Sequence, residues 1–352
     1  MTFATITRRS VLRPATARTK RSSPWCIVLA GGEGGRMIPM VNSWLGENRP
    51  KQYCTFVGSR SMFQHTLDRA RNIVPENHIV SVIGPGHRKF LSSALSGPLP
   101  GAIIEEPRNL GTVPGIFLAL AHIIARDPEA CVLILPSDQF VHPEQRFVRH
   151  AARACELADI HHNHVVLLAA VPDHPEGNYG WIQPGRKSAG GTVKVLGFRE
   201  RPGLVESCGL LEEGCLWNTM IMAVRAKTLW DLGRQCLPEM INWFDAFLML
   251  LHDIHTGKMG PEMELLAPSR LYRELYPADF SKDILQTTLN QSMVLPMEDV
   301  DWCDWACPRQ ISETLSRLNR HPLFPNDLAE QEYEPSSGAG DFPAEALCAS
   351  SR

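Results

Sequence analysis

One loop near the start of the chain restricts the choice of fold more than any other feature. The segment from Cys26 to Arg36, CIVLAGGEGGR, is an apolar run that leads into four glycines within five residues and ends on an arginine. The apolar run is typical of a buried strand, and glycine has no Cβ, so the loop after it brings backbone N–H groups close to an anion. We therefore expect a phosphate-binding loop; the alternative is a tight turn whose glycines serve only its geometry.

Two common glycine loops do not fit this segment. A dinucleotide fingerprint, G-x-G-x-x-G, would need a further glycine where Glu33 or Met37 stands. A Walker A loop would need lysine and then serine or threonine after Gly35, where Arg36 and Met37 follow. Both types are excluded.

The composition bounds the class of protein. A chain of 352 residues with 44% hydrophobic residues can bury the core of one large α/β domain. Its net charge of −3 gives no argument for a nucleic-acid partner, and no apolar stretch suits a membrane partner. The ten cysteines form no C-x-x-C pair, which favours reduced thiols and a cytoplasmic location.

The order of apolar patterns predicts an α/β fold. Short apolar runs predict strands at 26–30, 79–83, 131–135, 165–171, 193–198 and 216–224. Apolar residues at helical spacing predict helices at 61–74, 112–126, 144–159 and 226–236. The alternation implies a doubly wound, mostly parallel, Rossmann-like sheet, whose ligands bind at the carboxyl ends of the strands.

The two ends of the chain differ from its middle. Residues 1–23 are basic and contain no acid, which predicts a disordered tail. Residues 321–352 have few large apolar side chains and are predicted as a C-terminal tail. A single catalytic domain is expected over 24–320.

The glycine loop belongs to a longer pattern. It matches L-A-G-G-x-G-x-R-M-x-P from Leu29 to Pro39, and the sequence Arg49-Pro50-Lys51-Gln52 follows about ten residues later. Together these segments resemble the signature of the sugar-1-phosphate nucleotidyltransferases, closest to the mannose-1-phosphate guanylyltransferase branch. The resemblance implies that Arg36 and Lys51 are catalytic. It also implies that a nucleotide is bound by Leu29, Ala30, Gly31, Gly32, Gly34 and Gly35.

A second segment resembles the part of that family that packs against the base. Residues 106–115 read EPRNLGTVPG and lead into a predicted helix, for which Thr112 is a good N-cap. Arg108 and Asn109 resemble the start of the family's R-N-T-A-P, although two residues separate them from Thr112. The resemblance implies that all three bind the nucleotide.

Two aspartates are candidates for metal binding. Asp138 follows the buried run 131–135, where it could hold Mg²⁺ against phosphate oxygens or merely cap a helix. The segment Pro136-Ser137-Asp138 resembles the family's P-A-D, whose aspartate is a metal ligand and whose proline lies at the nucleotide. Asp304 resembles the aspartate of W-x-D-x-G, with Asp301 as the alternative. We expect Mg²⁺, with Mn²⁺ as a substitute.

Three further segments resemble the sugar side of the family. Tyr179 and Gly180 stand where a sugar ring could approach a strand, or where a plain bulge could lie. Phe198 to Pro202 resembles F-x-E-K-P, which implies that Glu200 binds sugar hydroxyls and that Arg201 replaces the lysine at the sugar phosphate. Asn218 resembles the asparagine of W-N-S/T-G, which contacts a sugar hydroxyl.

The order of these motifs implies a reaction. The expected activity joins GTP and mannose 1-phosphate into GDP-mannose with release of pyrophosphate. One alternative is glucose 1-phosphate with UTP or dTTP, and another is a regulator that binds nucleotide sugars without turnover. A homodimer is the expected assembly if the chain associates.

Overall fold

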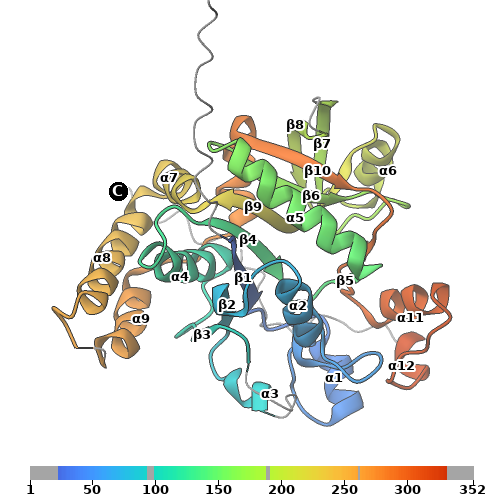
Figure 1. Cartoon of the computed structure of the whole chain (residues 1–352). Helices are drawn as coiled ribbons and strands as arrows, with labels where there is room; N and C mark the ends of the chain where they lie inside the picture. The colour runs from blue at the N-terminus through green and yellow to red at the C-terminus, as the bar shows by residue number, and fades with distance from the viewer. Residues whose placement is uncertain (1–22, 93–98, 188–190, 261, 331–352) are drawn as a thin grey trace, which may run out of the picture.

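The computed structural model describes residues 23–92, 99–187, 191–260 and 262–330 (Figure 1). The basic tail predicted over 1–23 therefore lies, apart from its last residue, outside the described residues. So does most of the predicted C-terminal tail.

A nine-stranded sheet forms the centre of the molecule, in the order β3-β2-β1-β4-β9-β6-β10-β8-β7. Its strands are β1 (Trp25–Ala30), β2 (Ile79–Ile83), β3 (Ala102–Glu105), β4 (Cys131–Pro136), β6 (Val165–Ala170), β7 (Gly180–Lys187), β8 (Val193–Glu200), β9 (Leu216–Arg225) and β10 (Ser292–Met297). Strands β8 and β9 run antiparallel to the other strands of this sheet. The predicted α/β fold with a mostly parallel sheet is confirmed.

Helices cover both faces of this sheet. The α-helices of the described chain are α1 (Ile38–Leu45), α2 (Met62–Arg71), α3 (Arg88–Ser92), α4 (Thr112–Ile124), α5 (Glu144–Ile160), α6 (Leu204–Glu212), α7 (Ala226–Cys236), α8 (Pro238–His255), α9 (Glu262–Glu274), α10 (Phe280–Asp283), α11 (Pro308–Arg317) and α12 (Asp327–Glu330). In Figure 1, α4, α7, α8 and α9 gather on one side of the sheet, and α2 and α5 lie on the other.

The alternation of side chains along β1 explains the two covered faces. Ile27 belongs to the core that α4, α7 and α8 complete, whereas Cys26 and Val28 belong to the core shared with α2 and α5. All three side chains are fully buried. A strand buried on both faces reads as a continuous apolar run, which is why the segment before the glycine loop has no polar alternation.

The packed part of the chain extends further than predicted. Phe324 and Leu328 are buried in a third core with Phe56 and Trp305, beside α1 and α11. The Leu323 N–H also donates a hydrogen bond to the Phe56 carbonyl at 2.8 Å. The packed part of the chain therefore runs past the predicted domain end at residue 320, because two large apolar side chains anchor 321–330 despite its polar composition.

A small second sheet brings the segment of Asp138 next to the segment of Asp304. β5 (Phe140–His142) pairs antiparallel with β11 (Asp301–Cys303). This pairing sets the residues after β4 beside the residues after β11. Asp138 and Asp304 are thus brought near each other although they are far apart in the sequence.

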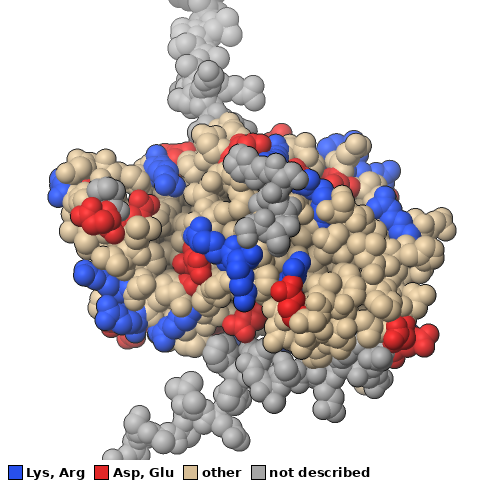
Figure 2. Space-filling model, turned by 90° about the horizontal axis from the view of Figure 1, so that it is seen from below, with Lys and Arg blue, Asp and Glu red and all other residues tan. Residues whose placement is uncertain are grey.

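The described surface carries charges of both signs. Figure 2 shows Lys and Arg interspersed with Asp and Glu over the face that it draws. Within the described ranges, none of the helices has the length and apolar character needed to cross a membrane.

Candidate active site

The glycine loop lies where the sequence predicts, at the carboxyl end of β1. Leu29 pairs with Pro136 at the end of β4, so these two predicted residues are neighbours. Gly34 has a φ of +66°, and a Cβ there would stand 2.9 Å from the backbone nitrogen of Lys51. Only glycine suits both the left-handed backbone and this close approach. A Cβ on Gly31 would stand 2.4 Å from a Glu106 carboxyl oxygen, so the loop is tightly enclosed there as well.

The side chains of Gln52 and Tyr53, in the segment after α1, bind backbone carbonyls of the loop. The Gln52 amide donates to the carbonyls of Ala30 at 3.0 Å and Gly32 at 2.6 Å. The Tyr53 hydroxyl also donates to the Ala30 carbonyl at 3.0 Å. The C=O and N–H of a trans peptide point in opposite directions, so the N–H groups that follow these two carbonyls point away from Gln52. Sequence reasoning missed this role of Gln52 and Tyr53.

A lysine and two aspartates meet beside the loop. The Lys51 ammonium lies 3.1 Å from Asp138 and 3.5 Å from Asp304, and it donates to the Asp304 carbonyl. Lys51 is only 4% exposed. Burial lowers the pKa of Lys51, but the two carboxylates outweigh it and hold this pKa above its usual value. Burial also raises the pKa of Asp304, opposed by Lys51 and by the exposed Arg36.

This donor set fits a magnesium ion. Asp138 and Asp304 are 38% and 32% exposed in their side chains, so both remain accessible. Mg²⁺ is usually held by one or two carboxylates together with phosphates and water. No cluster of three or more His, Cys, Asp or Glu suited to a metal occurs in the described part of the chain.

The positions of the aspartates decide between the alternatives raised from the sequence, which were a helix cap for Asp138 and Asp301 in place of Asp304. β5 follows Asp138, and the next helix, α5, has Pro143 as its N-cap, so Asp138 caps no helix. Asp301 is exposed on β11, opposite His142. Asp304, and not Asp301, therefore joins Lys51.

The predicted cap of α4 is wrong. Thr112 is the first residue of the helix, and Gly111 is its N-cap with a φ of +90°. A Cβ on Gly111 would stand 2.5 Å from the Ala278 carbonyl, so this position requires glycine. The Thr112 hydroxyl instead accepts a hydrogen bond from the Phe280 N–H at 2.7 Å.

The side chains of Arg108 and Asn109 also form hydrogen bonds within the protein. The Arg108 guanidinium donates to the carbonyls of Tyr272 and Leu275, at the end of α9. The Asn109 side chain accepts from the Gly111 N–H at 3.0 Å. Arg108 thereby links the segment before α4 to the end of α9, whereas Asn109 holds only the turn into α4.

Glu106 is a site residue that sequence reasoning missed. It follows β3, and its carboxyl lies between Gly31 and Gly115. The Tyr272 hydroxyl donates to it at 2.8 Å. Burial raises the pKa of Glu106 to about 7, although the Tyr272 hydrogen bond opposes the rise. The available signal was its place at the start of the motif that contains Arg108.

The predicted sugar side is assembled around Gly180. This glycine pairs with Glu200 on β8 and with Asn218 on β9. A Cβ on Gly180 would stand 2.7 Å from a Glu200 carboxyl oxygen. Burial and the nearby Asp279 raise the pKa of Glu200, whereas Arg201, 3.8 Å away, opposes the rise.

The Tyr179 side chain points away from Glu200 and Asn218. Its ring is buried, and its hydroxyl faces Cys303 and the backbone of Asp304. The structure thus places Tyr179 against the segment that carries the second aspartate.

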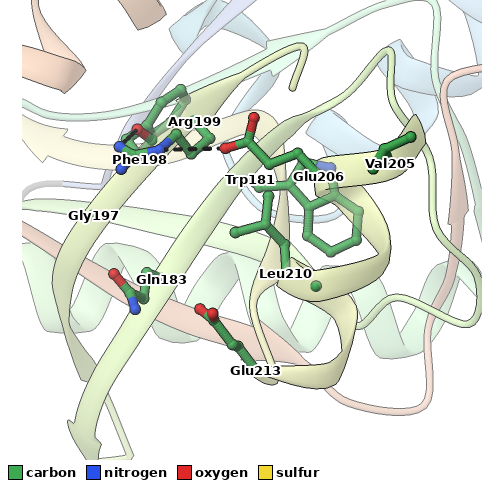
Figure 3. Close-up of a pocket in the computed structure, with 10 residues that line it drawn as sticks. Trp181, Gln183, Gly197, Phe198, Arg199, Val205, Glu206, Leu210 and Glu213 are labelled. Carbon is green, nitrogen blue, oxygen red and sulfur yellow. Dashed lines mark hydrogen bonds and ion pairs between the residues drawn. The ribbon is translucent and has the colours of Figure 1, made fainter. Parts of the chain in front are cut away.

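Two hollows lie near the sugar side. A pocket of about 490 Å³ between β7, β8 and α6 has Trp181 in its wall and the Arg199–Glu206 ion pair at 3.6 Å (Figure 3). None of the predicted site residues lines it. Glu200 lines a neighbouring pocket of about 530 Å³. The first pocket is therefore separate from the predicted site, and the second adjoins it.

A glycine loop at the end of a parallel strand, with a lysine and two aspartates beside it, is the arrangement expected of a phosphate-binding site in an α/β protein. The model of the nucleotidyl transferase family matches residues 25–243, which is more than half of the chain. The chain therefore belongs to the nucleotidyl transferase family.

Known proteins resemble the chain in sequence and fold. Xanthan biosynthesis protein XanB of Xanthomonas campestris pv. campestris (strain B100) is 32% identical over 304 residues, which are 84% of this chain and 61% of that protein. Mannose-1-phosphate guanylyltransferase of Escherichia coli (strain K12) is 26% identical over 327 residues, 89% of this chain and 65% of that one. The chain spans less than two thirds of the length of these relatives. A Thermus thermophilus crystal structure described as mannose-1-phosphate geranyltransferase has a TM-score of 0.72 at 22% identity, and the match covers 84% of this chain and 80% of that one. It shares the fold.

Proposed function

We propose that the chain transfers GMP from GTP to mannose 1-phosphate, giving GDP-mannose and pyrophosphate. The observation that carries this proposal is the Lys51 ammonium between Asp138 and Asp304, beside the glycine loop. Relatives named mannose-1-phosphate guanylyltransferase support the choice of substrates. A homodimer and a cytoplasmic location remain predictions.

The reaction needs orientation and charge more than proton transfer. An oxygen of the sugar phosphate attacks the α-phosphorus of GTP in line, a new P–O bond forms, and the bond to the pyrophosphate oxygen breaks. The attacking phosphate is already anionic at neutral pH, so no general base is required. Positioning and charge neutralisation then supply most of the acceleration.

Each group of residues has a proposed part in this step. The amides of the glycine loop and Arg36 bind the triphosphate, and Lys51 neutralises charge near the reacting phosphates. Asp138 and Asp304 would hold Mg²⁺, which when bound offsets the charge on the phosphate oxygens. Nothing in this scheme needs a residue to change its protonation state.

The sugar side is proposed to bind the second substrate. Glu200 and Asn218 would contact sugar hydroxyls over Gly180, where the missing Cβ leaves room for the ring. Arg201 would bind the sugar phosphate with its guanidinium fork, where the resembling family has lysine.

Glu106 is the proposed reader of the base. An ionised carboxylate can accept two hydrogen bonds, and the Watson–Crick edge of guanine presents two adjacent donors, N1–H and the N2 amino group. Uracil and thymine present a single donor there, so a carboxylate at this position favours guanine.

The affinity for GTP is expected to rise about tenfold from pH 6 to pH 8. The Glu106 pKa of about 7 leaves the carboxyl mostly protonated at the lower pH and mostly ionised at the higher one, and only the ionised form accepts both hydrogen bonds. Calorimetric titration with GTP across this range measures the change. Glu106→Gln is the control, because it keeps the shape and cannot titrate; an equal pH dependence in both proteins would contradict the assignment.

Arg201→Ala is expected to raise the KM for mannose 1-phosphate more than the KM for GTP. Removing a charged hydrogen-bond partner from one substrate weakens that substrate selectively. Arg201→Lys should retain activity, since it keeps the cation. Arg201 has a φ of +47°, so alanine and lysine meet the same backbone strain and form a matched pair. Equal rises in both KM values would refute the role.

The function itself is tested by pyrophosphate release across GTP, ATP, UTP and dTTP with mannose 1-phosphate and glucose 1-phosphate. We expect the highest kcat/KM with GTP and mannose 1-phosphate. A preference for glucose 1-phosphate with UTP or dTTP would replace the proposed substrates. Binding of GDP-mannose without turnover of any pair would instead identify a regulator.

A further inference from the structure

Tyr179 links the two halves of the site by two different atoms. Its backbone carbonyl accepts a hydrogen bond from the Arg201 N–H at 3.2 Å. Its hydroxyl oxygen accepts from the Asp304 N–H at 3.3 Å and lies 3.7 Å from the Cys303 sulfur. This one residue, next to the start of β7, therefore contacts the backbone of the proposed phosphate-binding arginine and of the proposed metal-binding aspartate.

We propose that Tyr179 is a positioning residue for the Asp304 carboxylate and makes no contact with the sugar. This inference rests on the proposed function, because it gives Asp304 its role in metal binding. The hydroxyl acts through the Asp304 backbone, and the Asp304 side chain acts on the metal and on Lys51.

The surroundings of the ring leave the hydroxyl little freedom to move. The ring centroid lies 5.2 Å from that of Trp217 and 5.2 Å from that of Trp302, both in edge-to-face arrangements. Tyr179 is 6% exposed. A ring held by two tryptophans keeps its hydroxyl at a constant place, which is what a support for a backbone N–H requires.

The two tryptophans against the ring argue against a stacked sugar. A sugar ring stacked on Tyr179 would have to displace Trp217 or Trp302 from its edge. A tyrosine hydroxyl can accept one hydrogen bond and donate another at the same time. Accepting from Asp304 leaves its proton free to point at Cys303.

The position of the Asp304 backbone sets the position of its carboxylate. Asp304 follows β11, at the point where the second small sheet ends. Trp305, the next residue, has a φ of +52°, so the chain turns sharply there. Without the hydroxyl, the Asp304 N–H at this turn loses its acceptor, and the carboxylate that lies 3.5 Å from Lys51 loses one of its supports.

The test replaces Tyr179 with phenylalanine in the full chain. Phenylalanine keeps the ring and its packing, so the fold should persist, as circular dichroism and a thermal melt will show. We expect the Kd for Mn²⁺, measured by electron paramagnetic resonance without nucleotide, to rise about tenfold. With substrates we expect kcat to fall about tenfold and the KM for mannose 1-phosphate to stay within about twofold.

Tyr276→Phe is the matched control, since it removes a hydroxyl from a tyrosine that is 41% exposed and outside the proposed site. It should leave all three quantities unchanged. A higher KM for mannose 1-phosphate in Tyr179→Phe with unchanged Mn²⁺ binding would overturn the proposal in favour of a sugar contact. Unchanged values throughout would overturn it as well.

This experiment separates the inference from the proposed function. If the wild type released no pyrophosphate with any substrate pair, the proposed function would fail while the Mn²⁺ titration still tested Tyr179. If the wild type turned over but both tyrosine variants bound Mn²⁺ equally well, only the role of Tyr179 would fail. A wild type that bound no Mn²⁺ would overturn the metal site, and this role with it.

Discussion

Replacing Lys51 with alanine is expected to lower kcat about a hundred- to a thousandfold. Lys51 places one positive charge between two carboxylates and beside the loop that would hold the triphosphate. Loss of one charge-stabilising contact of this kind costs about 2.7–4 kcal/mol of transition-state stabilisation. Arg36→Ala should have an effect of the same size. Pyrophosphate release under saturating substrates measures both.

The control for these variants is Lys227→Ala. Lys227 lies on α7 in an exposed ion pair with Asp231, so its loss changes the net charge equally and should leave kcat unchanged. Thermal melts must show that Lys51→Ala is folded, because the variant leaves two neighbouring carboxylates without their ammonium. A folded Lys51→Ala protein with nearly wild-type kcat would refute the phosphate-binding site.

Asp138→Asn is expected to abolish activity even at high Mg²⁺ concentration, and a chelator should abolish the activity of the wild type. Asparagine keeps the shape of aspartate and removes the charge that holds a hard cation. It also removes one of the two carboxylates that surround Lys51. Pyrophosphate release measured against Mg²⁺ concentration tests the expectation.

Asp301→Asn provides the matched control for Asp138→Asn. Asp301 is the other aspartate of the Asp301-Trp302-Cys303-Asp304 segment, and it is exposed on β11 away from Lys51. The same chemical change there should leave the Mg²⁺ dependence as in the wild type. Full activity of Asp138→Asn, or loss of activity in Asp301→Asn, would show that the metal ligands are assigned wrongly.

Local sequence patterns predicted the helices and strands whose apolar residues have a clear periodicity. Helix α7 was predicted residue for residue, because its apolar side chains recur at helical spacing between a strand and Leu237. The strand at 216–224 was also predicted, as β9, but its direction was not. Alternation along one strand holds no information on the orientation of its neighbours. The antiparallel course of β9 matters, since it brings Asn218 at the start of that strand next to Gly180.

The resemblance implied which residues gather but not what each one touches. Lys51, Asp138 and Asp304 meet as the resemblance implied. Arg108 instead holds backbone carbonyls of a segment more than 160 residues away, a contact that no local pattern contains. The packing of Phe324 and Leu328 was missed for the same reason, since several of their partners, such as Met40 and Phe56, lie near the other end of the chain.

The sequence alone determined the position of the glycine loop and the α/β class, because a buried strand followed by four glycines is a local pattern with few physical explanations. Only the tertiary structure decided that Glu106 is a buried carboxyl with a raised pKa and that the Tyr179 hydroxyl accepts a hydrogen bond from the Asp304 N–H. Burial and hydrogen-bond geometry are properties of chain segments brought together by folding. A residue's type states what it can do, and its neighbours in space decide which of these it does.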